Sequence, residues 1–175
     1  MITLENNSIK LRALEPTDID TLYDWENNQE IWQVSNTIVP FSKYILAKYI
    51  NNSHLDIYQT KQLRLIIEKK EDDEFCTVGM IDIFDFDPFH NRAGLGIFIN
   101  KKFQKQGIAS SALELIIAYC FNTIGLHQLF CNITTDNTSS LKLFEKNRFE
   151  IIGIKKDWIK TSTGWKDEYL LQLIS

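Results

Sequence analysis

Hydrophobic and polar positions change their spacing within the N-terminal part of the chain. From Ser8 to Leu14 they alternate, which is typical of a strand with one buried face. Pro16-Thr17-Asp18 then favours the start of a helix, and a second short helix is predicted to begin at Ser42. The stretch from Asn27 to Phe41 lies between these helices and has neither spacing, so we interpret it as a loop.

The rest of the chain is predicted to be mainly sheet. Leu63 to Glu68 and Cys76 to Phe86 flank a charged turn and are expected to form a hairpin. Helices are predicted from about Gly107 to Thr123 and from Asn137 to Lys146. Further strands are expected at Ala93 to Asn100, Leu129 to Thr134, Phe149 to Lys160 and Lys166 to Leu173. This order predicts an α/β or α+β fold, in which helices cover the faces of a mixed sheet.

Composition narrows the class of protein. The length of 175 residues is that of one domain, so residues 1–175 are expected to form a single domain. Hydrophobic residues make up 44% of the chain and charged residues 24%, which is typical of a globular protein and not of a disordered one. The net charge of -4 argues against a nucleic-acid partner and is compatible with a cationic substrate such as an amine.

The cysteines and the apolar segments predict a cytoplasmic protein. Cys76, Cys120 and Cys131 show no CxxC spacing, which suits reduced thiols, and no Cys/His cluster has the spacing of zinc ligands, so no metal is expected. The N-terminus lacks the basic and apolar regions of a signal peptide. The longest apolar stretch, Ala112 to Phe121, is too short to cross a bilayer, so no membrane partner is expected.

One segment has the features of an anion site. The strand ending in Ile97-Phe98-Ile99 is followed by a basic loop and then by a helix that begins with Gly107-Ile108-Ala109. The first N–H groups of a helix have no intrahelical partner, and the helix dipole adds positive potential there, so a phosphate is stabilised at this position. The alternative is an ordinary helix start with solvated lysines, and Gln-x-x-Gly-x-Ala taken alone favours that alternative.

The second half of the chain changes this balance. A strand is followed by Asn137-Thr138-Ser139-Ser140 and by a helix that leads to Phe149. Together with Gln104 to Ala109, this order resembles the GNAT family of N-acetyltransferases. Arg92-Ala93 and the strand from Gly79 to Asp87 look most like its branch of bacterial spermidine acetyltransferases and ribosomal-protein N-terminal acetyltransferases. The resemblance runs from Leu11 through nearly the whole chain. It implies a mainly antiparallel mixed sheet with splayed central strands, and transfer of acetyl from acetyl-CoA to a primary amine by direct attack.

The resemblance also implies roles for individual residues. Backbone groups of Phe98 and Ile99 would bond the pantetheine arm and hold the acetyl carbonyl, the loop would wrap the pyrophosphate, and Asn137 with Ser140 would touch the far side of the cofactor. From the residues alone, Asn137 fits a helix cap equally well. The residues assigned to acetyl-CoA are Ile97, Phe98, Ile99, Gln104, Lys105, Gln106, Gly107, Ile108, Ala109, Asn137, Ser140 and Lys146.

Two positions depart from the family pattern. Many relatives have Tyr where this chain has Phe144, as the acid that protonates the leaving thiolate, and many have Glu where it has Gly94. Direct attack requires neither group, because water can take the proton of the amine and CoA thiolate is a tolerable leaving group. The alternative hypotheses are a non-catalytic CoA-binding module and a purely structural fold without a cofactor.

Asp85 is the candidate catalytic residue, either as a charge partner for an ammonium group or as a base through water. Strict alternation would place Asp82 on one face with Met80, Phe84 and Phe86, and Asp85 on the other with Ile81, Ile83 and Asp87. A solvated carboxylate near a turn is the alternative. The aromatic residues that either frame an acceptor pocket or pack in the core are Tyr23, Trp25, Trp32 and Phe41.

The acceptor amine is left open by the sequence. Thr37 to Phe41 corresponds to an acid-rich acceptor loop of spermidine enzymes but contains no carboxylate. A protein α-amine or another small amine is therefore ranked ahead of spermidine. Self-association into a homo-oligomer is a further expectation.

Overall fold

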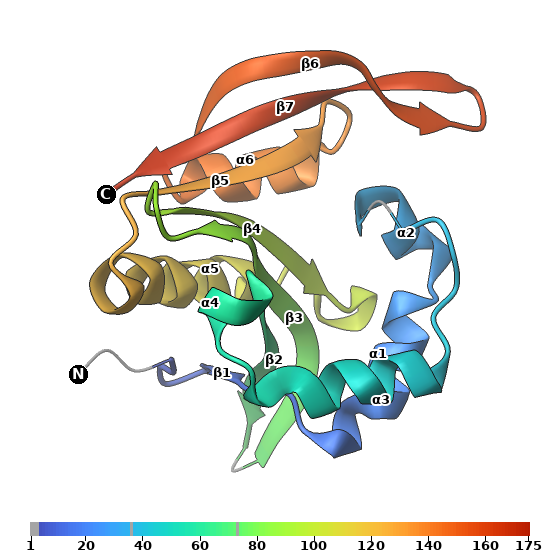
Figure 1. Ribbon diagram of the computed structural model, residues 1–175, viewed down its shortest axis with the longest axis vertical. Coiled ribbons are helices and arrows are strands. Elements are labelled where there is room, and N and C mark those ends of the chain that lie inside the picture. Colours follow the sequence, from blue (N-terminus) through green and yellow to red (C-terminus); the bar gives the residue numbers. More distant parts are fainter. Residues whose placement is uncertain (1–3, 36, 73) are drawn as a thin grey trace.

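The computed structural model describes residues 4–35, 37–72 and 74–175, and its centre is a seven-stranded sheet in the order β1-β2-β3-β4-β5-β7-β6 (Figure 1). Neighbouring strands are antiparallel except for β4 and β5, which are parallel. The strands are β1 (Ile9–Arg12), β2 (Leu63–Glu71), β3 (Glu74–Asp87), β4 (Arg92–Ile99), β5 (Gln128–Thr134), β6 (Glu150–Thr161) and β7 (Gly164–Ile174). The expected strands are confirmed.

Helices lie on both faces of this sheet. Adjacent strand residues point to opposite faces, so Ile66 packs with the N-terminal helices α1 and α3, whereas Ile67 packs with α5. The helices are η1 (Pro16–Asp18), α1 (Ile19–Glu26), α2 (Gln29–Ser35), α3 (Lys43–Asn51), η2 (Asn52–His54), α4 (Ile57–Thr60), η3 (Lys101–Phe103), α5 (Ile108–Tyr119), η4 (Cys120–Ile124, a π-turn) and α6 (Thr138–Lys146). The predicted class of a mixed sheet flanked by helices is confirmed.

The interpretation of Asn27 to Phe41 as a loop is wrong in part. Helix α2 occupies Gln29–Ser35, and its first turn is closed by N–H groups of Ile31 and Trp32 that donate to the Asn28 carbonyl. Ile31 is buried and packs in the same cluster as Leu22 and Trp25 of α1. A helix of two turns shows too little periodicity to be recognised, and tertiary packing stabilises it.

The central strands diverge, as the family resemblance implies. The ladder between β4 and β5 joins Arg92–Gly94 to Gln128–Phe130. Beyond it, β4 continues to Ile99 in pairing with β3, and β5 continues to Thr134 in pairing with β7. The sheet is therefore open between the second halves of β4 and β5.

Candidate active site

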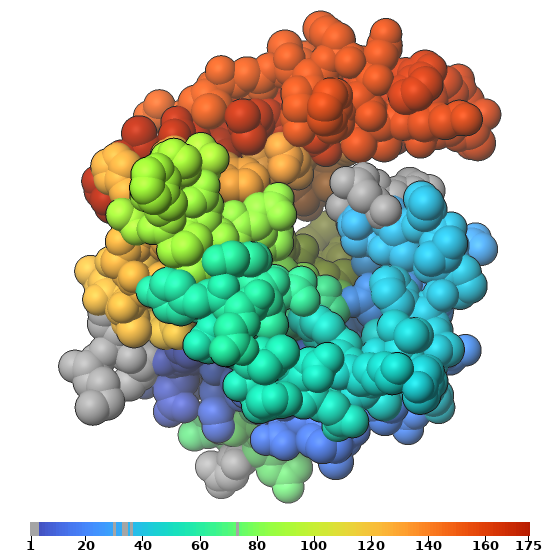
Figure 2. All heavy atoms as spheres, viewed as in Figure 1, coloured from blue at the N-terminus to red at the C-terminus, as the bar shows by residue number. Residues whose placement is uncertain are grey.

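A cavity of about 670 Å³ occupies this opening, a volume within the range of ligand-binding pockets. Its walls are Leu95 to Phe98 of β4 and Cys131 to Thr134 of β5, and it extends to Phe41 and Tyr49 on the side of α3. Figure 2 shows the molecule hollowed beneath the β6–β7 hairpin, opposite the N-terminal helices. The cavity is therefore bounded by both halves of the sheet and by the helices that precede β2.

The structure brings together part of the predicted cofactor set. Ile97, Phe98, Asn137 and Ser140 line the cavity. Ile99 is buried in the core beneath it, and the loop from Gln104 to Ala109 follows the end of β4, outside the cavity lining. Lys146 is exposed in the last turn of α6 and does not line the cavity either.

Gly107 suits the left-handed backbone conformation of the loop before α5. It has a φ of 79°, and a Cβ built on it would meet nothing within 4 Å. Lys105 also has a positive φ of 60°, so the loop turns sharply twice. The first intrahelical bond is from Ser111 N–H to the Gly107 carbonyl, 3.1 Å. The preceding N–H groups have no helical acceptor, which makes this loop chemically suited to an anion.

Asn137 caps helix α6, as its alternative interpretation predicts. Its Oδ1 accepts a hydrogen bond from the Ser140 N–H, 3.1 Å.

One turn later in α6, Phe144 is 3% exposed, lines the cavity and packs edge-to-face on Phe149, with ring centroids 5.0 Å apart. The wall at this position is therefore a hydrocarbon ring that has no proton to donate.

The space beside Gly94 is filled by Phe84. A Cβ on Gly94 would lie 2.3 Å from a carbon of the Phe84 ring, closer than any real contact. Phe84 also packs edge-to-face on Phe130, with centroids 5.8 Å apart, where β4 and β5 begin to diverge. A carboxylate at position 94 is thus excluded unless the Phe84 ring moves.

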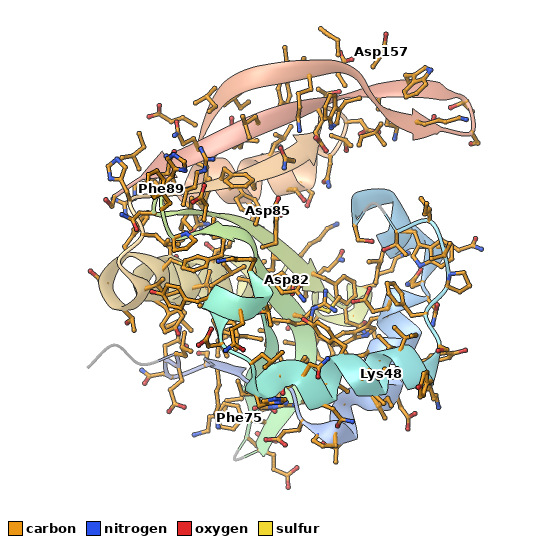
Figure 3. The ribbon with its side chains drawn as sticks, in the orientation of Figure 1. Lys48, Phe75, Asp82, Asp85, Phe89 and Asp157 are labelled. Atoms are coloured by element: carbon orange, nitrogen blue, oxygen red, sulfur yellow. The ribbon has the colours of Figure 1, made fainter. Side chains whose placement is uncertain are left out.

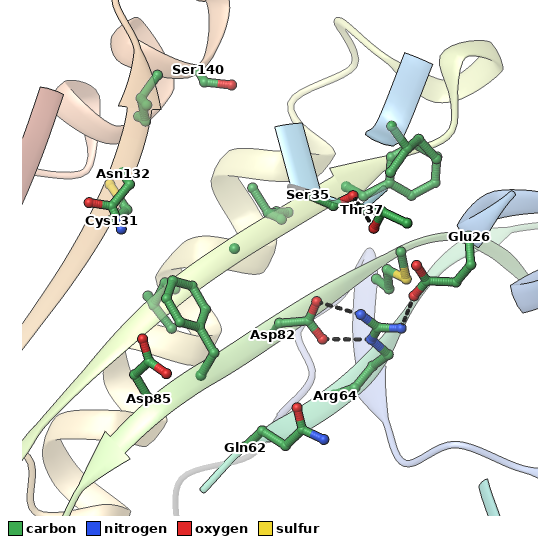
Figure 4. A pocket seen from close by; sticks show the side chains of 18 of the residues that line it. Glu26, Ser35, Thr37, Gln62, Arg64, Asp82, Asp85, Cys131, Asn132 and Ser140 are labelled. Carbon is green, nitrogen blue, oxygen red and sulfur yellow. Dashed lines mark hydrogen bonds and ion pairs between the residues drawn. The ribbon is translucent and has the colours of Figure 1, made fainter. Parts of the chain in front are cut away.

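An ion cluster that the sequence analysis missed forms one wall of the cavity. Arg64 of β2 donates two hydrogen bonds to Asp82, 2.7 and 2.9 Å, and a further one to Glu26 of α1 (Figure 4). Burial disfavours the charge of Arg64, but Asp82 and Glu26 outweigh it and raise its pKa. The cluster therefore holds two carboxylates and one guanidinium. Only the placement of Arg64 in an apolar strand hinted at it, because Glu26 is distant in sequence.

Asp85 lies on a β-bulge, so the predicted alternation along β3 is wrong beyond Phe84. The register with β4 shifts between Phe84 and Asp87, and Asp85 has a φ of 49°. Asp85 is exposed and lines the same cavity as Asp82 and Phe84, whereas Phe86 is buried in the core on the α5 side. Because the bulge inserts one residue, the side chains beyond Phe84 point to the faces of the sheet opposite to those predicted. Figure 3 shows Asp82 and Asp85 in the middle of the molecule.

The neighbouring Asp87 has partners that Asp85 lacks. Its carboxylate is 2.8 Å from Nδ1 of His90 and 3.2 Å from Arg92. Hydrogen bonds from His90, with the charge of Arg92, lower the pKa of Asp87 to about 2. Within residues 4–35, 37–72 and 74–175, the side chain of Asp85 makes no hydrogen bond or ion pair. It is thus the carboxylate in this region that is available to a ligand.

The predicted aromatic residues have different surroundings in the structure. Trp25 is buried and packs edge-on against Phe98, with centroids 5.1 Å apart, whereas Phe41 lines the cavity. Tyr23 lies under the Lys43 ammonium, 5.3 Å away, and Trp32 donates its Nε1–H to the Glu26 carbonyl, 2.6 Å. Phe41 is therefore the member of this set placed to contact a ligand.

Across residues 4–35, 37–72 and 74–175, no group of three or more His, Cys, Asp or Glu side chains is placed to hold a metal ion. The same stretches contain no helix with the length and apolar character needed to span a bilayer.

Known proteins share this sequence pattern and fold. The family profile described as acetyltransferase (GNAT) domain matches residues 8–150. The uncharacterized N-acetyltransferase p20 of Bacillus licheniformis is 28% identical, over 99% of this chain and 97% of that protein. Spermidine N(1)-acetyltransferase of Escherichia coli K12 is 22% identical, over 84% of this chain and 75% of that protein. Spermidine N-acetyltransferase from Vibrio cholerae, solved with CoA and spermine, superposes with a TM-score of 0.86 at 20% identity, over 97% of this chain and 96% of that one. Because the profile covers most of its length, the chain belongs to the GNAT family of acetyltransferases.

Proposed function

We propose that this chain transfers the acetyl group of acetyl-CoA to a primary amine inside the cavity between β4 and β5. The observation that carries the proposal is the divergence of these two strands into an opening that is followed in sequence by the anion-suited loop before α5. Acetyl-CoA supplies the acetyl thioester. The nitrogen of the amine forms a bond to the carbonyl carbon, the carbon–sulfur bond breaks, CoA leaves as a thiolate, and the amine loses its proton to water or a carboxylate.

Strand β4 offers backbone groups to the cofactor, and hydrogen-bond alternation indicates which ones. The Asn100 N–H donates to the Val78 carbonyl, 2.8 Å, next to the paired residues Ile99 and Gly79. Such a bond flanks a non-hydrogen-bonded pair, so Ile99 and, two residues earlier, Ile97 direct their backbone groups away from β3. In agreement, Gln104 Nε2 donates to the Ile99 carbonyl, 3.0 Å. We therefore assign the thioester and the pantetheine arm to Ile97 and Ile99, ahead of the Phe98 backbone.

The loop and α6 complete the proposed cofactor site. N–H groups from Gln104 to Ala109 would hold the pyrophosphate, because Gly107 leaves the space in front of them open. Asn137 and Ser140 would contact the cofactor from the β5 side, since both line the cavity. Lys146, at the C-terminal end of α6, would act at a distance through its charge.

Asp85 is proposed to receive the amine. It is the carboxylate without a protein partner in this part of the described chain, and it lines the cavity beside Phe84. An ammonium group held there can lose its proton through water and then attack. Phe144 cannot protonate the thiolate, so water is assigned that step. Relatives named as spermidine acetyltransferases support an amine acceptor.

A matched pair of glycine variants tests the cofactor assignment. Gly107 and Gly125 both have a φ of 79°, and neither would bring a Cβ within 4 Å of another atom. We expect Gly107→Val and Gly125→Val to lose similar stability, about 1–2 kcal/mol from the left-handed conformation. Calorimetry should show acetyl-CoA affinity reduced by at least about tenfold in Gly107→Val alone. Lys105→Ala should weaken acetyl-CoA binding by about 1 kcal/mol or less, because it removes one exposed charge.

Equal affinities in the two glycine variants would overturn the loop assignment. Release of CoA is then followed for the wild-type chain with a panel of polyamines, aminoglycosides and short peptides. Tight CoA binding without turnover of any amine would favour the alternative, a CoA-binding module without catalysis. Absence of any thermal shift with CoA would exclude both.

A further inference from the structure

A second cavity of about 580 Å³ lies beside the first on the face of the sheet opposite α5. All of its lining residues belong to strands: Asp85, Asp87, Arg92, Gln128, Phe130, Ile152, Leu170 and Gln172. Leu129 and Leu171 are buried under α5, so alternation turns Phe130 and Leu170 to the other face. A β-bulge between Ile151 and Gly153 leaves Ile152 on this face as well. The helices that precede β2 pack on β2, β3 and β4 and leave this part of the sheet open.

The two cavities are adjoining compartments. Phe84 lines the first and Phe130 lines the second, and these two rings pack edge-to-face against each other. Asp85 lines both cavities, because the bulge in β3 places it at the edge of this ring pair. A molecule whose amine is held at Asp85 in the first cavity would therefore extend past the rings into the second.

The side chains that line the second cavity fit a ligand segment that is uncharged. Asp87 is occupied by His90 and Arg92, which leaves Asp85 as its one carboxylate without a partner among residues 4–35, 37–72 and 74–175. Its floor is apolar, with Phe130, Leu170 and an Ile152 that is 52% exposed. At one end, the amide side chains of Gln128 and Gln172 hydrogen-bond each other and retain further donors and acceptors. A second ammonium group would find no free carboxylate there, whereas apolar side chains and peptide groups would.

We propose that the second cavity binds the part of the acceptor that follows its reacting amine. The acceptor is then the N-terminal segment of a peptide or protein with apolar residues close to its α-amine. The direction in which the acceptor peptide lies rests on the proposed function, because the amine reacts in the first cavity. Two observations favour this occupant over a second copy of the chain. Asp85 lines both cavities, and among the described residues it is the one carboxylate of the second cavity without a partner, which complements one ammonium group.

Variants of two isoleucines on β6 test this assignment. Ile152 lines the second cavity, whereas Ile154 is similarly exposed, 44% against 52%, and lines neither cavity. Three amines are compared: alaninamide, the amide of alanyl-leucyl-leucyl-alanine, and spermidine. In Ile152→Asp the ratio of KM for the tetrapeptide amide to KM for alaninamide should rise about tenfold, which corresponds to ~1.4 kcal/mol. Ile154→Asp should leave this ratio at its wild-type value, and Ile152→Asp should lower KM for spermidine by adding a carboxylate.

Binding is measured apart from turnover. Calorimetry with CoA in place of acetyl-CoA should show that the tetrapeptide amide binds the wild-type chain about tenfold more tightly than alaninamide and loses this advantage in Ile152→Asp. Peptide binding with this pattern, but without acetylation, would refute the proposed function and support the cavity assignment. Equal effects of the two aspartate variants, or no preference for the peptide, would overturn the inference. So would sedimentation that shows a dimer dissociated by Ile152→Asp, which would assign the surface to a second copy.

Discussion

The contact between Gly94 and Phe84 allows a stability prediction with a defined magnitude. A Cβ at position 94 would lie 2.3–2.8 Å from three carbons of the Phe84 ring. The ring cannot move freely, because it packs against Phe130. In Gly94→Ala we therefore expect an overpacking cost of about 1–3 kcal/mol. It is offset by about 0.4–1 kcal/mol, because alanine restricts the unfolded chain and the φ of Gly94 is not left-handed.

The effect of Gly94→Ala on the free energy of unfolding should change sign when the Phe84 ring is removed. In a Phe84→Ala background the three atoms nearest to the methyl group of Ala at position 94 are removed, so Gly94→Ala should stabilise the fold by about 0.4–1 kcal/mol. The coupling energy between the two positions is then about 1–3 kcal/mol. Gly96→Ala is the matched control on the same strand, because its Cβ would meet Phe84 at an ordinary 3.8 Å.

Urea unfolding of the wild-type chain, the two single variants, the double variant and the control measures this cycle. For a chain of this length, 1 kcal/mol corresponds to roughly 2–4 °C in the melting temperature, so thermal unfolding gives an independent value. Additivity of Gly94→Ala and Phe84→Ala within about 0.5 kcal/mol would refute the contact. Equal stabilities of Gly94→Ala and Gly96→Ala would refute it as well.

Other predictions concern the cavity and the thiols. Asparagine tolerates the left-handed backbone at position 85, so Asp85→Asn should raise KM for cationic acceptors with little change in kcat. A fall in kcat of about 10²-fold would instead make Asp85 the base. Phe144→Tyr should lower the free energy of unfolding by about 1–3 kcal/mol if its hydroxyl stays unpaired, with CoA release equal or faster; a severe loss of turnover at unchanged stability would contradict this. Burial raises the pKa of Cys120 to about 12 and also raises that of Cys131, so a thiol reagent at neutral pH should modify neither before unfolding; rapid labelling of either in the native chain would contradict their burial.

Much of the fold could be predicted because its signals are local. The β2–β3 hairpin has alternating strands on either side of a charged turn, and α5 begins at a glycine that has the left-handed conformation of its turn. The cap at Asn137 follows from the position of its side chain before a helix. Each of these features depends on residues that are close in sequence, so pattern and chemistry were sufficient.

The missed features depend on contacts between distant residues. Arg64 and Glu26 are separated by 38 positions and meet only because α1 packs across β2. The short α2 is held by the burial of Ile31 against residues of α1. The bulge at Asp85 has no marker of its own in the sequence, since aspartate fits either an alternating strand or a left-handed position. Sequence reasoning therefore identified Asp85 as a candidate while placing its side chain on the wrong face.

The bulge and the glycine can be understood as one local arrangement. With Gly94 in β4, the Phe84 ring fills the space that a side chain at position 94 would need, so a carboxylate is presented from that position only if the ring moves. The extra residue in β3 instead places the Asp85 carboxylate beside the same ring and returns Phe86 to the core on the α5 side. In a regular strand Asp85 would face that core, where an unpaired charge is strongly disfavoured. We therefore expect the presence of an acid at this end of the cavity to depend on the bulge as much as on the identity of residue 85.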